Sequence, residues 1–279
     1  MRVFRRCAVY VLVAYLALLL FLMFFEESLI FVPAKYPDGD FQPPGLAFED
    51  AHFTAADGTR LHGWYLERRD AIAVLLFAHG NAGNLTHRAD VLRVLHQHLP
   101  ATVMIFDYRG YGRSEGTPTE EGILQDARAA RAWLARRAGI AEAQIVLLGR
   151  SLGGAVMVDL ATRDGARALI LEGTFTSLPD VGAYHYPWAP VRLLMRTRLD
   201  SLAKIGNYHG PLLQSHGDAD RIVPYELGRR LHDAVPGAAK KFLRIPAGDH
   251  NDPQPGWYYD ELRAFLRGLD DRPAAALDT

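Results

Sequence analysis

A serine stands at the centre of GRSLG, residues 149–153. The apolar segment before it, residues 144–148, is typical of a buried strand, and residues 152–162 are typical of a helix. On a sharp strand-to-helix turn a serine hydroxyl is exposed, flanking glycines let neighbouring backbone approach closely, and the helix N-terminus supplies N–H groups. The pattern therefore predicts that Ser151 is a nucleophile. The alternative is a glycine-rich turn that carries an incidental serine.

A serine nucleophile needs a general base, and the base needs an acid that orients it. Among the 11 histidines, His250 follows the strand-like segment 241–245 and precedes a helix. From that position a histidine on a neighbouring strand could reach Ser151. We therefore expect His250 to be the base, and the alternative is a surface-loop histidine.

Two aspartates compete for the orienting role. Asp218 and Asp220 both follow the strand-like segment 212–215. Asp218 and Ala219 are typical of a turn, because an aspartate side chain readily bonds nearby backbone. We therefore expect Asp220 to be the acid, with Asp218 as the alternative.

The loop after another apolar segment, residues 71–78, is HGNAGN at residues 79–84. Its small residues can fold tightly and point an N–H towards Ser151. A tetrahedral intermediate needs donors about 3 Å from its oxyanion. We expect these donors to be the backbone N–H of Asn81, or alternatively of Ala82, and the N–H of Leu152. His79 is more typical of a packed structural histidine than of a catalytic one.

A charged, glycine-rich loop, DYRGYGRS, occupies residues 107–114. It lacks the spacing and the lysine of a phosphate-binding loop. We interpret it as a structured turn in which Asp107 and Arg109 hold loops together by ion pairing.

The elements around these loops alternate. A hairpin is expected over 47–55 and 59–66, with further strands at 71–78, 102–106, 144–148, 168–171, 212–215 and 241–245. Helices are expected at 85–99, from Thr117 onward, and at 152–162, 224–235 and 257–269. Thr117 is the expected cap of its helix, with Pro118 at the first position and Glu120 completing a capping box. Alternation of this kind predicts a parallel sheet with helices on both faces, whose chemistry lies at the carboxyl ends of the strands.

Composition excludes several classes of protein and site. The chain has 279 residues, with 31 basic and 32 acidic side chains. This balance lacks the basic footprint that nucleic acid requires, so no nucleic-acid partner is expected. Cys7 is the single cysteine, which excludes an intramolecular disulfide and a cysteine-based zinc or iron–sulfur site.

The N-terminus carries an uncharged apolar run at residues 7–25. About 20 apolar residues span the hydrocarbon layer of a membrane as a helix. Three arginines precede the run and two glutamates follow it, so the positive-inside rule places the N-terminus in the cytoplasm and the remaining chain on the outer side. We expect an uncleaved anchor. The alternative is a cleaved signal peptide, whose apolar region is usually shorter.

Prolines and glycines after the apolar run are typical of a linker. The expected organisation is an anchor at 1–30, a linker at 31–46, a catalytic domain at 47–270 and a tail at 271–279. The insertion between the strands ending at 171 and beginning at 212 is the expected lid, about residues 174–210.

Taken together, the motifs resemble those of the α/β-hydrolase superfamily, and in particular its membrane-anchored α/β-hydrolase-domain proteins. The five matching segments are 79–84, 107–116, 149–154, 216–224 and 248–252, and the resemblance extends from Phe48 to Leu269. It implies an eight-stranded sheet and hydrolysis of an ester, a thioester or occasionally an amide by a serine, without a metal or other cofactor. Carried over to this chain, it supports Ser151, Asp220 and His250. Asp249 departs from the pattern, because relatives often have a small or uncharged residue there.

The composition of the expected lid gives an indication of the substrate. Tyr184, Tyr186, Trp188 and Leu194 lie in it, together with several arginines. An apolar lid beside a membrane anchor suggests a lipid-like acyl substrate, although the same side chains would also serve as a cover for the sheet. A membrane-anchored serine esterase or thioesterase is the expected function. A serine peptidase and a non-catalytic binding protein on the same fold are the alternatives.

Overall fold

Six neighbouring strands run parallel in this chain. A seventh strand extends the sheet antiparallel to them, and the eighth, at the edge, pairs antiparallel with the seventh. The structure is a computed structural model that describes residues 2–269. The strand order is β1-β2-β4-β3-β5-β6-β7-β8. The strands are β1 (Glu49–Thr54), β2 (Arg60–Leu66), β3 (Ala73–Ala78), β4 (Ala101–Phe106), β5 (Val146–Arg150), β6 (Ala168–Glu172), β7 (Leu212–Gly217) and β8 (Lys240–Ile245). The expected eight-stranded, mostly parallel sheet is confirmed.

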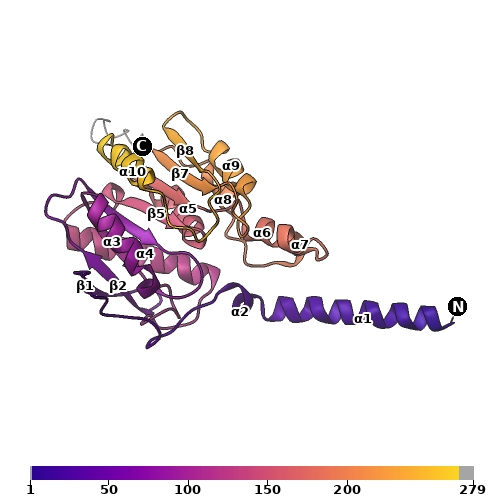
Figure 1. Cartoon of the computed structure of the whole chain (residues 1–279). Coiled ribbons are helices and arrows are strands. Elements are labelled where there is room, and N and C mark those ends of the chain that lie inside the picture. Colours follow the sequence, from indigo (N-terminus) through magenta and orange to yellow (C-terminus); the bar gives the residue numbers. More distant parts are fainter. Residues whose placement is uncertain (1, 270–279) are drawn as a thin grey trace.

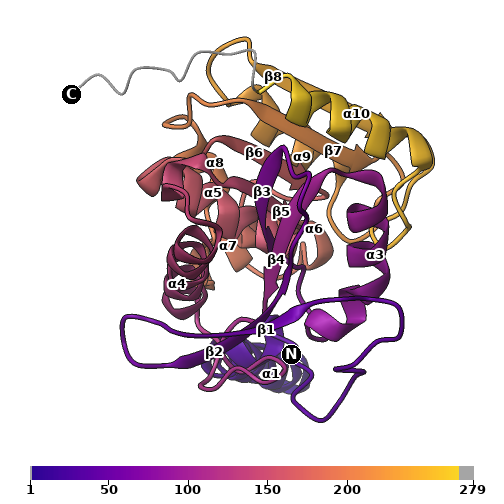
Figure 2. The same cartoon turned by 90° about the vertical axis from the view of Figure 1, so that its left-hand side faces the viewer.

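Helices cover both faces of this sheet (Figures 1 and 2). The α-helices are α1 (Arg2–Phe24), α2 (Glu26–Ile30), α3 (Ala89–His98), α4 (Glu120–Ala138), α5 (Leu152–Asp164), α6 (Leu178–His185), α7 (Val191–Leu194), α8 (Ser201–Ile205), α9 (Tyr225–Asp233) and α10 (Gly256–Arg267). Two short 3-10 helices are η1 (Leu85–Arg88) and η2 (Glu142–Gln144). The segment 174–210, which we expect to be the lid, contains α6, α7 and α8.

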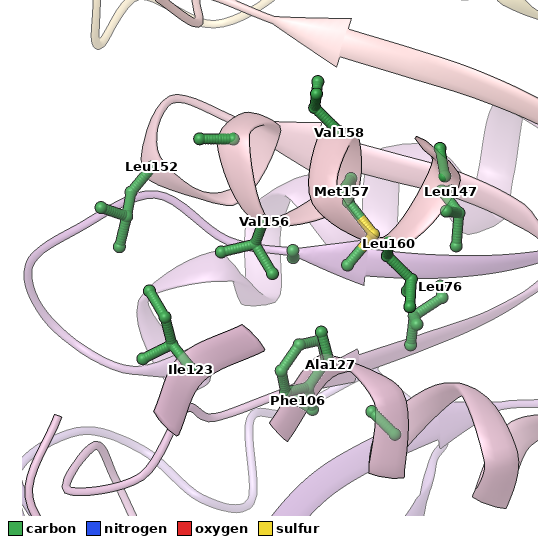
Figure 3. Close-up of a cluster of buried hydrophobic side chains, with 14 of the residues drawn as sticks. Leu76, Phe106, Ile123, Ala127, Leu147, Leu152, Val156, Met157, Val158 and Leu160 are labelled. Carbon is green, nitrogen blue, oxygen red and sulfur yellow. The ribbon is translucent and has the colours of Figure 1, made fainter. Parts of the chain in front are cut away.

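Central strands such as β3 are apolar throughout because both of their faces are covered. In β3, Leu76 and Ala78 belong to the buried cluster that contains α4 and α5, whereas Leu75 and Phe77 belong to the cluster that contains α3 and α10. Figure 3 shows part of the first cluster, where Val156 and Met157 of α5 pack with strand side chains. Both faces of the strand are therefore withdrawn from water, as a parallel sheet requires.

The predicted cap of α4 is wrong. The helix begins at Glu120, and its N-cap is Thr119, whose hydroxyl accepts the N–H of Gly122 at 3.0 Å. Glu120 does not complete a capping box with Thr117. Instead its carboxylate accepts the backbone N–H groups of Arg198 and Leu199 at 2.6 and 3.0 Å. A tertiary contact with the segment before α8 therefore takes up the glutamate that the local pattern assigned to the cap.

The N-terminal helix α1 extends away from the sheet (Figure 1), and within the described residues it is the one helix long and apolar enough to cross a membrane. The following segment, 31–46, forms no regular element but lies against the sheet domain. Isolated β-bridges join Pro33 to Gly83 and Lys35 to Gly112, and Phe31 and Phe41 are buried. The expected tail at 271–279, and residue 270 at the end of the expected catalytic domain, lie outside the described residues.

Candidate active site

Ser151 lies on the tight turn between β5 and α5. Its φ and ψ are 53° and −118°, a left-handed conformation that a residue with a side chain rarely adopts. Three hydrogen bonds hold it there: its N–H donates to the carbonyl of Glu172 at 2.8 Å, and its carbonyl accepts the N–H of Gly154 at 2.9 Å and the Thr174 hydroxyl at 2.8 Å. A strained backbone conformation that the surrounding structure holds in place is common at functional sites.

Two glycines flank Ser151 because the backbone is crowded there. A Cβ on Gly149 would lie 2.4 Å from the carbonyl oxygen of Gly153, and a Cβ on Gly153 would lie 2.0 Å from that of Ala78. Both distances are shorter than van der Waals contact. The glycines of the GRSLG segment are thus required by close approach, and they let β3 and α5 pack against the turn.

His250 meets both Ser151 and Asp220. Its Nε2 lies 3.0 Å from Ser151 Oγ, and its Nδ1 lies 2.7 Å from Asp220 Oδ2. An ionised carboxylate can only accept, so Nδ1 carries the hydrogen and Nε2 is left to accept the serine hydroxyl. A residue 99 positions after the serine in the chain is thereby within proton-transfer distance of it.

Asp220 is held as an anion. Burial by itself would raise the pKa of this carboxyl, but hydrogen bonds from His216, His250 and the N–H of Val223 outweigh it and keep the pKa well below its ordinary value. Oδ1 accepts the N–H groups of Ile222 and Val223 at 2.9 and 2.7 Å. Nε2 of His216 lies 3.3 Å from Oδ2 and donates to the carbonyl of Val223 at 2.9 Å. Sequence reasoning did not give His216 a role, although it lies only four positions before Asp220.

Asp218, the alternative acid, is engaged elsewhere. Its carboxylate accepts Arg244 Nε at 2.7 Å and the N–H of Ala247 at 2.6 Å. These bonds tie the loop after β7 to the loop after β8. Asp218 therefore supports the loop that carries His250, whereas Asp220 contacts the imidazole itself.

The HGNAGN loop lies beside Ser151. A Cβ on Gly80 would be 3.4 Å from the Cβ of Ser151, so the two backbones are in contact at this point. Within residues 2–269, no acceptor is bonded to the backbone N–H of Asn81, Ala82 or Leu152. These are the expected oxyanion donors, and the structure leaves their hydrogens available for a ligand.

The segment after the anchor helix holds this loop, a contact that the sequence pattern did not indicate. The Asn81 carboxamide donates to the carbonyl of Ile30 and accepts the N–H of Val32 at 3.2 Å and the Tyr111 hydroxyl at 2.7 Å. Backbone bonds join Gly83 N–H to Val32 O at 3.1 Å and Ala34 N–H to Gly83 O at 2.9 Å. Ile30, Val32 and Ala34, which follow the membrane-length helix, thus hold the loop that lies beside Ser151.

Two further contacts fix the loop of His250. Arg150 donates from Nη2 to the carbonyl oxygen of His250 at 2.8 Å. The Asp249 carboxylate accepts the N–H of His250 at 2.8 Å and pairs with Arg221, whose backbone and side-chain hydrogen bonds lower the pKa of Asp249 to about 2. Asp249 thus contacts the backbone of the loop that carries His250 and the Arg221 side chain.

The 107–114 loop is a structured turn, as expected. Among the described residues Arg109 forms ion pairs with aspartates, whereas the basic side chain paired with the Asp107 carboxylate is that of His79. Arg109 is buried and binds Asp126 at 2.8 Å and Asp57 at 2.7 Å. Asp107 accepts the N–H of Leu85 at 2.7 Å and lies 3.4 Å from Nε2 of His79. Both rest inside the loop cluster and stabilise it.

The four lid candidates lie apart from these residues. Tyr184, Tyr186 and Trp188 are exposed and Leu194 is half-buried. In the described part of the chain no hydrogen bond or ring contact joins them to Ser151 or His250. One lid residue does approach the site, since His185 Nε2 donates to the carbonyl of Ile222, two residues after Asp220. The described residues also contain no cluster of three or more His, Cys, Asp or Glu side chains arranged to hold a metal ion.

Comparison with known proteins gives relatives along most of the chain. Residues 69–204 match the family model described as serine aminopeptidase, S33. An uncharacterised protein of Mycobacterium tuberculosis is 38% identical over 257 residues, which cover 90% of this chain and 91% of that one. The α/β hydrolase domain-containing protein WAV2 of Arabidopsis thaliana is 34% identical, with 83% of each chain covered. An uncharacterised membrane protein of Saccharomyces cerevisiae is 33% identical, with 80% of each covered.

Among solved structures, the esterase Pf2001 of Pyrococcus furiosus superposes with a TM-score of 0.69. The alignment covers 85% of this chain and 98% of the esterase at 18% identity. At that identity the similarity is one of fold.

Proposed function

Because this chain belongs to the α/β-hydrolase family, we propose that it is a serine hydrolase that cleaves carboxylic ester or thioester bonds with Ser151, His250 and Asp220. The observation that carries the proposal is the continuous pair of contacts through His250, 3.0 Å to Ser151 Oγ and 2.7 Å to Asp220 Oδ2. A nucleophile, a base and an orienting acid are recognised by this geometry.

The proposed reaction has two halves. Ser151 Oγ attacks the carbonyl carbon while its proton passes to Nε2 of His250, and the imidazolium then gives that proton to the leaving alcohol or thiol. The acyl group is now bound to Ser151. Water attacks it with His250 again taking a proton, which returns to Oγ as the acid leaves. Asp220 remains ionised and stabilises the imidazolium throughout.

The tetrahedral intermediates carry a negative oxygen that must be stabilised. The N–H groups of Asn81 and Leu152 are our proposed donors, and Leu152 adds the positive end of the α5 dipole. Their freedom from other acceptors among residues 2–269, and the contact of Gly80 with Ser151, support this assignment.

The proposed substrate is a small-molecule or lipid-like acyl compound. The exposed aromatic side chains of the lid and its position beside α1 favour acyl chains over hydrophilic substrates. The matching family model, described as serine aminopeptidase, favours a second candidate, a peptidase on the same fold. The two candidates share the nucleophile and differ in the leaving group.

We further propose that α1 is an uncleaved membrane anchor with its N-terminus in the cytoplasm and the sheet domain on the outer side. Its apolar length and the arginines before it support this orientation. A signal sequence is the competing reading of the same helix. An intact N-terminus on the membrane-extracted protein, read by mass spectrometry, decides between them.

The full chain in detergent tests the activity. We expect a fluorophosphonate probe to label the native protein and not Ser151→Ala. Absence of labelling would overturn the proposed mechanism. Hydrolysis of p-nitrophenyl esters of increasing acyl length, compared with aminoacyl-anilides, then separates the candidates: preference for the anilides would replace the esterase by the peptidase.

A further inference from the structure

We propose that the lid tip, defined as residues 184–193, lies in the lipid bilayer beside α1, so that the hydrolase takes its acyl substrate from that bilayer. The inference rests on α1 being a membrane helix and, for the substrate, on the proposed hydrolase activity. The proposed partner of the lid tip is a lipid surface.

The lid tip presents large apolar side chains to its surroundings. Tyr184, Tyr186 and Trp188 are 61%, 55% and 51% exposed, and Leu193 is 83% exposed. Arg192 is the one Lys, Arg, Asp or Glu among residues 184–193, and its guanidinium pairs with Asp180 at 2.9 Å. Large exposed apolar side chains gathered in one short segment mark an interaction site.

A contact with α1 sets the depth of the lid tip. The Tyr15 hydroxyl donates to the carbonyl of Trp188 at 3.1 Å, and the two rings meet edge to face with centroids 6.4 Å apart. Tyr15 precedes Phe24, the last residue of α1, by nine positions, which is about 14 Å along a helix. If the apolar run of α1 fills the hydrocarbon layer, Trp188 lies below the headgroups.

Several backbone groups of the lid tip are already bonded, as such a medium requires. An unpaired N–H or carbonyl is costly in hydrocarbon. Pro187 and Pro190 have no N–H, Tyr186 N–H donates to the carbonyl of Gly182 at 2.8 Å, and Ala189 N–H donates to that of Tyr186 at 3.0 Å. The Tyr15 hydroxyl, itself polar within an apolar helix, satisfies the carbonyl of Trp188.

The root of the lid is fixed where α1 ends. The buried Glu26 carboxylate accepts the N–H groups of Arg196 and Thr197 at 2.9 and 2.6 Å, and Arg196 Nη2 donates to the carbonyl of Met23 at 2.9 Å. The exposed guanidinium of Arg196 therefore lies at the height where lipid phosphates are expected. α6 and α7 lie alongside the end of α1 in Figure 1. His185, within the lid tip, donates to the carbonyl of Ile222 and so joins the lid tip to the loop of Asp220. The proposed entry side for an acyl chain is therefore the side of the site that faces the lid.

Depth-dependent quenching tests this placement in the full chain reconstituted in phosphatidylcholine vesicles. The chain has four tryptophans, of which Trp188 and Trp257 are comparably exposed, at 51% and 42%. We expect lipids brominated in the acyl chain to quench the native emission, Trp188→Phe to abolish most of the quenching, and Trp257→Phe on α10 to retain it. Equal quenching in native protein and Trp188→Phe would overturn the proposal. The proposal would also be overturned if the Trp188 emission changed with the number of protein molecules per vesicle and not with brominated lipid, because a second copy of the chain would then cover the lid tip.

A kinetic comparison tests the substrate route. For Leu193→Asp we expect hydrolysis of a long-chain lipid ester in vesicles to fall at least several-fold, with hydrolysis of a soluble short-chain p-nitrophenyl ester unchanged. An equal loss on both substrates, or no loss on either, would overturn the route. Failure of the proposed hydrolase function itself would look different, because the native protein would then cleave neither substrate and label with no probe. Release of the native protein by alkaline carbonate would overturn the membrane premise.

Discussion

Arg150, the residue before the proposed nucleophile, donates from Nη2 to the carbonyl oxygen of His250 at 2.8 Å. The turn that presents Ser151 and the loop that presents His250 are therefore joined by a direct bond in addition to the contact between the two reacting side chains. A buried or half-buried hydrogen bond from a charged donor is worth about 1.5–3 kcal/mol, enough to keep a loop in one position.

Arg150→Met removes this bond and keeps the length of the side chain. We expect kcat for a soluble ester to fall roughly 10–100-fold, the kinetic equivalent of losing that bond, with a smaller change in KM because the loop positions a base and not the substrate. Arg150→Lys retains a donor and should recover part of the rate. Equal rates for Met and Lys variants would contradict a positioning role.

Asp220→Asn should lower kcat by about 10⁴-fold, because an amide no longer holds the His250 tautomer that accepts the serine proton. The asparagine keeps an oxygen for the N–H groups of Ile222 and Val223, so the fold should persist. Asp218→Asn is the matched control, and we expect a rate close to native. Steady-state kinetics of both variants checks this pair, and a larger loss in Asp218→Asn would exchange their roles.

Acid stability should depend on Asp220. Its pKa is lowered in the folded chain, so folding favours the ionised form and the unfolded chain binds the proton more tightly. The resulting stability is fully present above the pKa of an unfolded aspartate, about 3.9, and is lost as pH falls through the lower folded pKa. The difference in free energy of unfolding between the native chain and Asp220→Asn should therefore shrink as pH falls below about 4. Urea unfolding at several pH values measures it, and a difference that grows below about pH 4 would refute the assignment.

Asn81→Ala tests the coupling of the anchor-proximal segment to the site. It removes the carboxamide that binds Ile30, Val32 and Tyr111 but keeps the backbone N–H proposed as an oxyanion donor. We expect kcat to fall, by less than the 10²–10³-fold that follows complete loss of one donor. The loss should be smaller for a thionoester than for the matching ester, because sulfur accepts hydrogen bonds weakly. Asn207→Ala, the same change at an exposed position, is the control. A loss of equal size on both substrates would indicate a general structural effect.

The buried ion pairs of Arg109 should dominate the stability of its loop. Arg109→Met leaves the buried Asp126 carboxylate uncompensated, which costs about 3–5 kcal/mol in comparable sites. Arg60→Met breaks an exposed pair with Glu115 and should change the free energy of unfolding far less, because solvent screens an exposed pair. Denaturant unfolding of the two variants checks the contrast. The double variant Arg109→Met, Asp126→Asn should recover part of the loss, and no recovery would contradict the argument.

The pattern of apolar residues within short segments predicted much of the fold. The predicted strands at 71–78 and 102–106 correspond to β3 and β4, which are buried on both faces, although β3 begins only at Ala73. Ile123, Ala127, Ala130 and Leu134 share the buried face of α4, as their spacing indicates. Such patterns reflect contacts between residues close in sequence and a single period of burial. The cap of α4 failed on the same ground, since a distant segment binds Glu120.

The sequence alone therefore determined the order of the strands and of the helices outside the lid, the apolar N-terminal helix and the serine turn. Each follows from the periodicity or the motif of a short segment, whereas the lid helices α6, α7 and α8 were not predicted. Only the tertiary structure decided that His250 meets Ser151 across 99 positions, that Asp218 turns to Arg244, and that Ile30 and Val32 hold Asn81. These contacts depend on the register of whole strands and the packing of loops at one edge of the sheet, which no single segment specifies.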